Sequence, residues 1–463
     1  MTVEFEFRVP VLVMGGGACG AAAALAARDA GLDVLLVERD AHPMGTSGMS
    51  MGVFCGAGTK AQATQGITDS GEIFFQDIMT KSRGEADPVA AKALAYGSGA
   101  TIDWLTEQHH IPITLDMGFR PSYGNSTYRI HGWAGHGGQD VIELLHQRMA
   151  DAGVDVLMEA RVVNIIAGPD GAAAGVEIER PDGARELVGC DTLIVASGGF
   201  AGNHEMLAQY IPAMAEARNN GHEGSQGDGI KLVQNLGGDV GDMGAFQGYA
   251  MLTDPQGISV PPAVLIEGGI LVNNLGERFV NESDDIAGMV FPVMEQPDGY
   301  AWVVFDESIN AKCDYVPDLQ TINGLNAAKL GADAAKLAER MGVSAEALAA
   351  SIAGVHQAKA EGRTDALGRA WDDAAPPQGD LRALKVVGAI YHTQGGLQIN
   401  ADARVLRQDG SPLPNIFAGG GAARSVSGSS SWGYLPAMGL CTALTLGRIA
   451  GEAAARQVLG AEG

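Results

Sequence analysis

The chain has 463 residues, 46% of them hydrophobic and 18% charged, so it is long enough to form two or three folded domains. Its formal net charge of −25 argues against binding to nucleic acid or to an anionic membrane surface. The composition is that of an ordinary globular protein and excludes a disordered or fibrous one.

The cysteines and the apolar runs set further limits. Five cysteines are scattered along the chain without a close pair, which excludes a CxxC metal or redox site and leaves no metal site to expect. No apolar run reaches the ~18 residues that a membrane-spanning helix needs. The first predicted strand begins within about ten residues of the start, which leaves no room for a signal peptide. We therefore expect a cytoplasmic protein with no membrane span and no nucleic-acid partner.

The first predicted unit is a strand, a glycine-rich turn and a helix. Residues 11–14 form an apolar run that leads into Gly15, Gly17 and Gly20, and an alanine-rich helix follows. Gly15 permits a tight turn, Gly17 lets the backbone approach a pyrophosphate, and Gly20 lets the helix pack closely on the strand. Glu38 ends the next apolar run, where it can accept hydrogen bonds from a ribose. The spacing predicts dinucleotide binding, with an ordinary strand–helix–strand turn as the alternative.

The remaining elements alternate between strands and helices. In chain order the sequence predicts a loop of small residues over 42–52, helices within 70–110 and over 139–150, a strand over 154–157, a meander over 161–166, 174–179 and 192–196, an extended segment over 270–280, a strand over 301–305, alanine-rich helices within 326–361, and a closing helix over 436–457. The strands at 193–196 and 415–418 both run into glycines, which places two more glycine-rich turns at the edge where ligands bind in such sheets.

Composition divides the chain into three segments. Residues 1–240 and 386–463 are predicted to form one doubly wound α/β domain, and residues 241–385 to be an inserted domain of different character.

Six short motifs occur in order over nearly the whole length. They are residues 15–20 (GGGACG), 196–203 (ASGGFAGN), 227–229 (GDG), 276–282 (GERFVNE), 392–396 (HTQGG) and 447–451 (GRIAG). By these motifs the chain resembles the flavoprotein family of fumarate reductases and 3-ketosteroid dehydrogenases. The resemblance implies FAD as cofactor, a Rossmann-type FAD-binding domain with an inserted α+β capping domain, and hydride exchange between flavin N5 and a substrate carbon.

The resemblance also implies which residues contact FAD. They are Gly15, Gly17, Ala18, Cys19, Gly20, Glu38, Arg39, Thr46, Ser47, Gly52, Val162, Ala196, Ser197, Gly198, Asn203, Asp228, Gly420, Gly439 and Leu440. Some relatives attach FAD covalently to a histidine at the position of Thr46 and Ser47. We therefore expect a non-covalent flavin here, and only the nearby His42 keeps the covalent alternative open. Gly421 stands where the family usually has an acidic residue.

The chain departs from the fumarate reductases at the residues that hold their dicarboxylate. The family's proton-donating arginine falls on Ile286, and a second arginine falls on Tyr434 or, with a gap, on Ser431. The histidine of the family's Gln-x-His-Pro-Thr stretch falls on Tyr249. Since guanidinium groups bind carboxylates best, we do not expect a fumarate-type reaction.

The stretch 430–434 is instead similar to the ketosteroid dehydrogenases, which use a tyrosine there to bind a ketone oxygen. We expect a dehydrogenase that introduces a C=C bond alpha,beta to the carbonyl of a cyclic ketone or a 3-ketosteroid-like substrate, with the beta hydride passing to flavin N5. Tyr434 is expected to donate to the ketone oxygen, Tyr249 is the first candidate base, and His392 orients the substrate or lowers the pKa of a phenol.

Each catalytic expectation has an alternative. Tyr123, Tyr128 or a carboxylate from residues 284–285 could supply the base, while Tyr434, Tyr249 and His392 could serve in packing alone. Two other functions also stay open: reduction of an activated alkene, as in fumarate reductases, and a flavin electron-transfer subunit with a separate protein partner. The electron acceptor is unknown.

Overall fold

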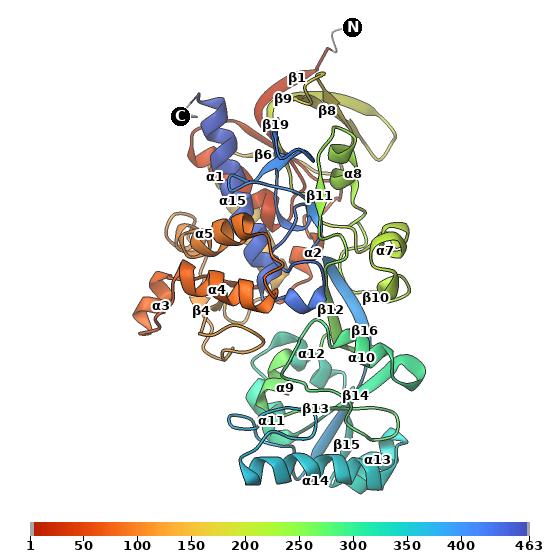
Figure 1. The fold of residues 1–463 in the computed structure, drawn as a ribbon. Coiled ribbons are helices and arrows are strands. Elements are labelled where there is room, and N and C mark those ends of the chain that lie inside the picture. The colour runs from red at the N-terminus through yellow and green to blue at the C-terminus, as the bar shows by residue number, and fades with distance from the viewer. Residues whose placement is uncertain (1–3, 461–463) are drawn as a thin grey trace. The chain divides into compact units, whose positions relative to one another are not determined.

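The computed structural model describes residues 4–460, and the chain divides into two compact units. The first unit comprises Met1–Phe246 and Tyr391–Gly463, and the second comprises Gln247–Ile390. The second unit is therefore an insertion in the chain of the first, and both can be followed by colour in Figure 1.

An eight-stranded sheet forms the centre of the first unit. The strands are β1 (Phe7–Met14), β2 (Val34–Val37), β6 (Asp155–Leu157), β7 (Arg161–Ala167), β8 (Ala173–Glu179), β9 (Arg185–Val195), β18 (Arg404–Leu406) and β19 (Pro412–Ala418). The order is β18–β19–β9–β1–β2–β6, and β8 joins β9 to β7 by antiparallel pairing. The pairs β1–β2, β1–β9, β9–β19 and β2–β6 are parallel. Parallel strands lie buried on both faces, which is why β2 is a continuous apolar run with every residue buried.

Two helices pack closely against each other beside this sheet, α1 (Ala18–Asp29) and α15 (Met438–Val458). Glycines in α15 allow the contact. A Cβ atom added at Gly447 would lie 2.3 Å from the carbonyl oxygen of Cys19, and one at Gly451 would lie 2.3 Å from that of Ala23. The GRIAG motif therefore has a packing role.

Further helices and small strands complete the first unit. Its other helices are α2 (Gly45–Gly48), α3 (Lys60–Thr64), α4 (Gly71–Lys81), α5 (Pro88–Glu107), α6 (Gly138–Ala152), α7 (His204–Tyr210) and α8 (Asp228–Gln234). Its small strands are β3 (Val53–Cys55), β4 (Thr114–Leu115), β5 (Ile130–Gly132), β10 (Arg218–Asn219), β11 (Val240–Gly241) and β17 (Gly396–Leu397). The helical stretch predicted within 70–110 consists of two helices, because Asp87 caps a new helix that begins at Pro88.

The second unit is an α+β fold. Its strands are β12 (Phe246–Thr253), β13 (Ile270–Val272), β14 (Tyr300–Asp306), β15 (Lys329–Gly331) and β16 (Leu381–Thr393), of which β12 and β16 continue into the first unit. Its helices are α9 (Pro262–Glu267), α10 (Val290–Met294), α11 (Glu307–Cys313), α12 (Pro317–Gly324), α13 (Ala334–Met341) and α14 (Ala345–Glu361). Strands β13, β14, β16 and β15 pair antiparallel. The α/β first unit and the inserted α+β unit confirm the predicted fold class.

Two side chains of the GERFVNE motif, those of Arg278 and Glu282, are buried in the second unit. Arg278 Nη2 is 2.6 Å from Glu282 Oε2, and Arg369 Nη1 is 3.0 Å from the same oxygen, with all three side chains buried. The extended segment predicted over 270–280 was wrong in its length: strand β13 ends at Val272, because the side chain of Asn273 accepts from the N–H groups of Leu275 and Glu277 and forms a turn.

Candidate functional site

The first glycine-rich turn brings two strand ends together. Gly15 has φ +111°, and a Cβ atom there would lie 2.5 Å from the carbonyl oxygen of Ala196, which follows the neighbouring strand β9. A Cβ atom at Gly20 would lie 1.8 Å from the carbonyl oxygen of Gly15. Only glycine fits at either position, so this turn conformation requires the two glycines that the sequence has there.

The start of α1 offers backbone donors to an anion. Its N-cap is Gly17, which has no side chain, and the Ala18 N–H donates to Ser47 Oγ at 3.3 Å. A helix N-terminus with free N–H groups attracts phosphate through these donors and the helix dipole. Thr46 lies beside Ser47, with its hydroxyl 3.3 Å from Ser225 Oγ.

Glu38 is held at the end of β2. Its carboxylate accepts hydrogen bonds from Gly16 N at 2.6 Å and from Asp40 N at 2.9 Å. Arg39 Nη1 donates to the carbonyl of Gly224 at 2.8 Å. Glu38 is therefore fixed next to the first glycine-rich turn, as a ribose-binding carboxylate must be.

Two further turns reach the same sheet edge. A Cβ atom at Gly420, after β19, would lie 3.0 Å from Cys19 Cβ, and one at Gly421 would lie 2.7 Å from the nitrogen of Gly199. The hydroxyl of Ser197 is buried without a hydrogen-bond partner among residues 4–460. The three turns therefore converge, and they leave a polar group for a ligand to satisfy.

The other predicted FAD contacts are distributed around this edge. Val162 is buried in β7, Gly52 lies with φ +74° against the backbone of Gly137, and Asp228 begins α8, where it pairs with Arg161 at 3.1 Å. Asn203 caps α7 by accepting from Met206 N. Because α7 uses this side-chain oxygen, a structural role accounts for Asn203 without a ligand.

These features fit FAD. The turns meet at one sheet edge through glycines whose Cβ atoms would meet backbone, the N-cap residue of α1 has no side chain, and Ser197 Oγ lacks a partner among residues 4–460. Gly15, Gly17, Ala18, Glu38 and Ser197 are the residues that would hold the dinucleotide.

Tyr434 lies at the N-terminus of α15. It is 4% exposed, and the backbone N–H groups of Gly439 and Met438 face its hydroxyl closely enough to lower the pKa. Burial raises the pKa of Tyr434 above its usual value, and the two N–H groups offset this only in part. Because burial has the larger effect on this pKa, the phenol stays protonated at pH 7 and can donate a hydrogen bond.

His392 lies next to Tyr434. The two ring centroids are 5.7 Å apart and the planes meet at 68°, an edge-to-face contact. Burial lowers the pKa of His392 to about 4, so the imidazole is neutral at pH 7. A Cβ atom at Gly439 would lie 2.9 Å from His392 Nε2. His392 thus lies beside Tyr434 and Gly439, which the sequence predicts as catalytic and FAD-binding residues; Leu440 follows Gly439 in α15.

Tyr249 belongs to the second unit. It is 4% exposed, and its hydroxyl donates to the carbonyl of Val260. In the same unit Ile286 is buried, and Asp285 Oδ1 accepts from Ala287 N at 3.1 Å. The hydroxyl of Tyr249 is thus oriented by the backbone of its own unit.

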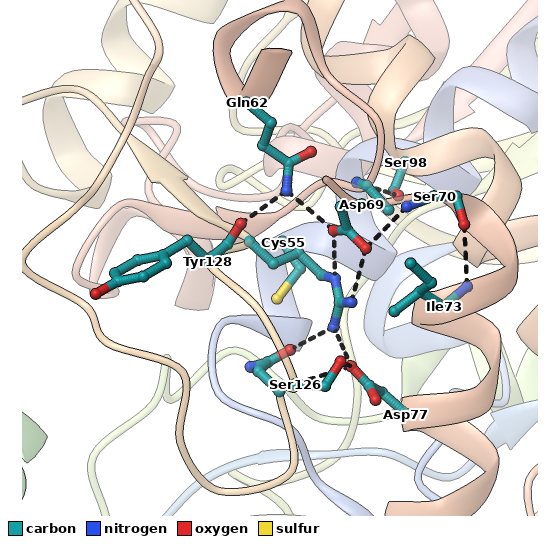
Figure 2. Close-up of polar contacts among 12 residues, drawn as sticks. Cys55, Gln62, Asp69, Ser70, Ile73, Asp77, Ser98, Ser126 and Tyr128 are labelled. Carbon is teal, nitrogen blue, oxygen red and sulfur yellow. Dashed lines mark hydrogen bonds and ion pairs between the residues drawn. The ribbon is translucent and has the colours of Figure 1, made fainter. Parts of the chain in front are cut away.

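A buried ion cluster fixes the loop that carries Tyr123 and Tyr128 in the first unit. Arg129 binds Asp69 at 2.9 Å and Asp77 at 2.7 Å, and Figure 2 shows the cluster with Tyr128 directed away from it. The carbonyl of Tyr128 accepts from Gln62 at 2.7 Å. Sequence analysis missed this cluster, because its members lie up to 60 residues apart without a local pattern.

Comparisons with known proteins show which family the chain matches. The family model described as "FAD binding domain" matches residues 10–439. Among curated relatives, fumarate reductase (cytochrome) of Shewanella frigidimarina is 29% identical over 97% of this chain and 77% of its own length. The 4-oxocyclohexanecarboxylate 2-dehydrogenase of Sinomonas cyclohexanicum is 25% identical over 97% of this chain and 93% of its own.

Solved structures agree. A flavocytochrome c3 fumarate reductase in an open conformation has a TM-score of 0.82 and 28% identity, covering 98% of this chain and 79% of its own. The 3-ketosteroid-Δ4-(5α)-dehydrogenase from Rhodococcus jostii RHA1 has a TM-score of 0.77 over 98% of both chains, and at 23% identity it supports the fold alone. No helix within residues 4–460 is both long and apolar enough to cross a bilayer.

Proposed function

This chain belongs to the FAD binding domain family and is an FAD-dependent oxidoreductase of carbon–carbon bonds; on that premise we propose that it desaturates a cyclic ketone between the alpha and beta carbons. The expected membership in the family of fumarate reductases and 3-ketosteroid dehydrogenases and the expected FAD are thereby confirmed. Bound FAD supplies the acceptor for the beta hydride, and the chain supplies the remaining chemistry.

The observation that carries the proposal is the position of the Tyr434 hydroxyl. Tyr434 is a neutral donor, and the backbone N–H groups at the start of α15 polarise it. When an alpha proton leaves a ketone, negative charge develops on the carbonyl oxygen, and a fixed donor in a buried site stabilises that charge. His392 adds a second neutral group beside it.

The residues at the arginine positions favour a ketone over a dicarboxylate. Ile286 is apolar and Tyr434 is phenolic, so neither offers the charged donor that a carboxylate needs when it loses its hydration. The relative named 4-oxocyclohexanecarboxylate 2-dehydrogenase supports the ring-ketone class, since the compound in its name is a ring ketone, with one carboxylate in addition.

Removal of the alpha proton falls to a base, for which Tyr249 is our candidate. A phenol with its ordinary pKa of ~10 is a weak base at neutral pH, so a nearby donor has to stabilise its anion. In the structure the hydroxyl of Tyr249 donates to the carbonyl of Val260, which stabilises the protonated phenol, so the base role requires that such a donor replace this contact.

Anaerobic reduction of the flavin tests the proposal. Cyclohexanone derivatives and 3-ketosteroids are mixed with the oxidised holoenzyme, and loss of the flavin absorbance is followed. We expect bleaching by a ketone, and we expect Tyr434→Phe to slow it by ~10²–10³-fold, as for the loss of an oxyanion donor. Tyr96→Phe is the matched control, since Tyr96 is exposed and bonded to Glu72.

The competing function is reduction of an activated alkene, supported by the 29% identity to a fumarate reductase. Rapid reoxidation of the chemically reduced enzyme by fumarate, together with no response to any ketone, would establish that function and contradict ours.

A further inference from the structure

The side chain of Gln394 holds one nitrogen of His392. Gln394 Nε2 lies 2.9 Å from His392 Nδ1, and Gln394 Oε1 lies 3.1 Å from Ser427 Oγ. Gln394 is 3% exposed and Ser427 is 2% exposed. The hydroxyl of Ser427 donates to the amide oxygen, which turns the amide NH₂ group toward the imidazole.

The backbone around Gln394 is fixed as well. Its N–H group donates to the carbonyl of Ala245 at 2.8 Å, and its carbonyl accepts from Ser425 N at 2.8 Å. The hydroxyl of the preceding residue, Thr393, accepts from Phe200 N at 3.1 Å. The amide is therefore presented to His392 from a rigid strand end.

This contact determines where the imidazole carries its proton. An amide NH₂ group can only donate, so the nitrogen that it faces must accept and is unprotonated. A neutral imidazole then carries its proton on Nε2. Nε2 lies on the side of Gly439, and the imidazole meets the Tyr434 ring edge to face, so two uncharged donors belong to neighbouring side chains.

We infer that Gln394, oriented by Ser427, is a positioning residue that fixes His392 as the neutral Nε2–H tautomer and so makes the site selective for a ketone oxygen over a carboxylate. A neutral N–H group is a sufficient partner for a carbonyl oxygen. A carboxylate needs charged donors to replace its hydration, and an uncharged imidazole does not provide them. The selectivity rests on the proposed function, whereas the tautomer does not.

One contact favours the opposite tautomer. The carbonyl of Thr393 lies 3.4 Å from His392 Nδ1 and would accept from a proton there. The Gln394 contact is shorter by half an ångström, 2.9 Å against 3.4 Å. The two contacts require opposite protonation of Nδ1. A measurement of the His392 tautomer therefore shows directly whether the Gln394 contact determines it.

Nitrogen NMR of the holoenzyme labelled with ¹⁵N-histidine measures the tautomer. The His392 signals are identified by their loss in His392→Gln. We expect Nδ1 to resonate as an unprotonated nitrogen and Nε2 as a protonated one at pH 7. A proton on Nδ1, or on both nitrogens, would overturn the inference whether or not the enzyme desaturates ketones.

Substitution of Gln394 tests the selectivity. In Gln394→Glu a carboxylate accepts from Nδ1–H and favours the imidazolium, so we expect the ratio of fumarate to cyclohexanone affinity to rise at least tenfold. Gln394→Met is the matched control, because it has a similar size but neither a hydrogen bond nor a charge. Both affinities are measured anaerobically from changes in the flavin spectrum.

The outcomes are distinct. Equal affinity ratios in Gln394→Glu and Gln394→Met would refute the selectivity. Failure of every ketone to reduce the flavin, with the Nε2–H tautomer observed, would count against the proposed function alone. Ser427→Ala should release the amide and lower kcat for the ketone with little change in KM, and restoration by Ser427→Thr would support the hydroxyl as the orienting group.

Discussion

The side chains of Arg129 and Asp69 form a two-point ion pair without any exposed surface on either partner. Nε lies 2.9 Å from Oδ2 and Nη2 lies 3.0 Å from Oδ1, while Nη1 reaches Asp77 at 2.7 Å (Figure 2). Asn125 contributes a further acceptor at 3.0 Å. Two carboxylates thus share one guanidinium, Gln62 and Ser126 donate further hydrogen bonds to them, and the loop between Asn125 and Arg129 is tied to α4.

Removal of the Arg129 guanidinium should destabilise the folded protein. We expect Arg129→Met to lower the free energy of unfolding by ~3–5 kcal/mol, because it leaves two buried carboxylates without their partner. Urea denaturation of the holoenzyme measures it. Arg185→Met is the control, since Arg185 pairs with Glu177 and Glu179 at the surface and should change stability by less than ~1 kcal/mol. Equal losses in the two variants would contradict the prediction.

The buried side chain of His131 should make the free energy of unfolding depend on pH. It is buried, with Nδ1 at 2.8 Å from the carbonyl of Arg129 and Nε2 at 2.9 Å from Thr59 Oγ1, and burial lowers its pKa to about 4. The unfolded chain binds this proton near pH 6.5 and the folded chain only near pH 4. Between these values the unfolded state holds more protons, so the contribution is complete above pH 6.5 and is lost as the pH falls toward 4.

The measurement compares His131→Gln with the parent chain. The stability difference between them should shrink by ~2–3 kcal/mol from pH 7 to pH 4.5, since a pKa shift of one unit corresponds to about 1.4 kcal/mol. A difference that stays constant over this range would show that His131 does not titrate as expected.

Local patterns made the FAD side of the site predictable. The positions of Gly15, Gly17 and Gly20 follow from the conformation and close approach that one short turn requires, and Glu38 follows from the strand next to it. The start of a second helix at Pro88 also has a local signal, an Asp–Pro pair typical of a helix N-terminus.

Contacts between distant segments were not predictable. Gln394 and Ser427 lie 33 residues apart, and nothing in either segment indicates that they meet. The backbone N–H groups that face Tyr434 depend on where α15 begins, and helix ends are the least certain part of a pattern. The roles of Tyr249, Tyr434 and His392 stay predictions, because they depend on a substrate.

The role of the first glycine-rich turn in FAD binding can be tested by adding one methyl group at Gly20. Gly20→Ala should abolish most FAD binding, because its Cβ atom would lie 1.8 Å from the carbonyl oxygen of Gly15 and the backbone cannot yield. The ratio of flavin to protein absorbance measures it. Gly354→Ala is the control: nothing lies within 4 Å of the added atom in α14, so it should keep FAD and stabilise the chain by ~0.5–1 kcal/mol. Normal FAD content in Gly20→Ala would contradict the assigned turn.

The attachment of FAD can be tested by denaturing the protein. Thr46 and Ser47 carry no group suited to a stable flavin bond, and their hydroxyls are engaged with Ser225 and Ala18. We therefore expect acid precipitation to release all FAD into the supernatant. Flavin fluorescence that stays with the protein on a denaturing gel would show a covalent bond, and its loss in His42→Ala would assign the bond to His42, the exposed histidine nearest to this loop in the sequence.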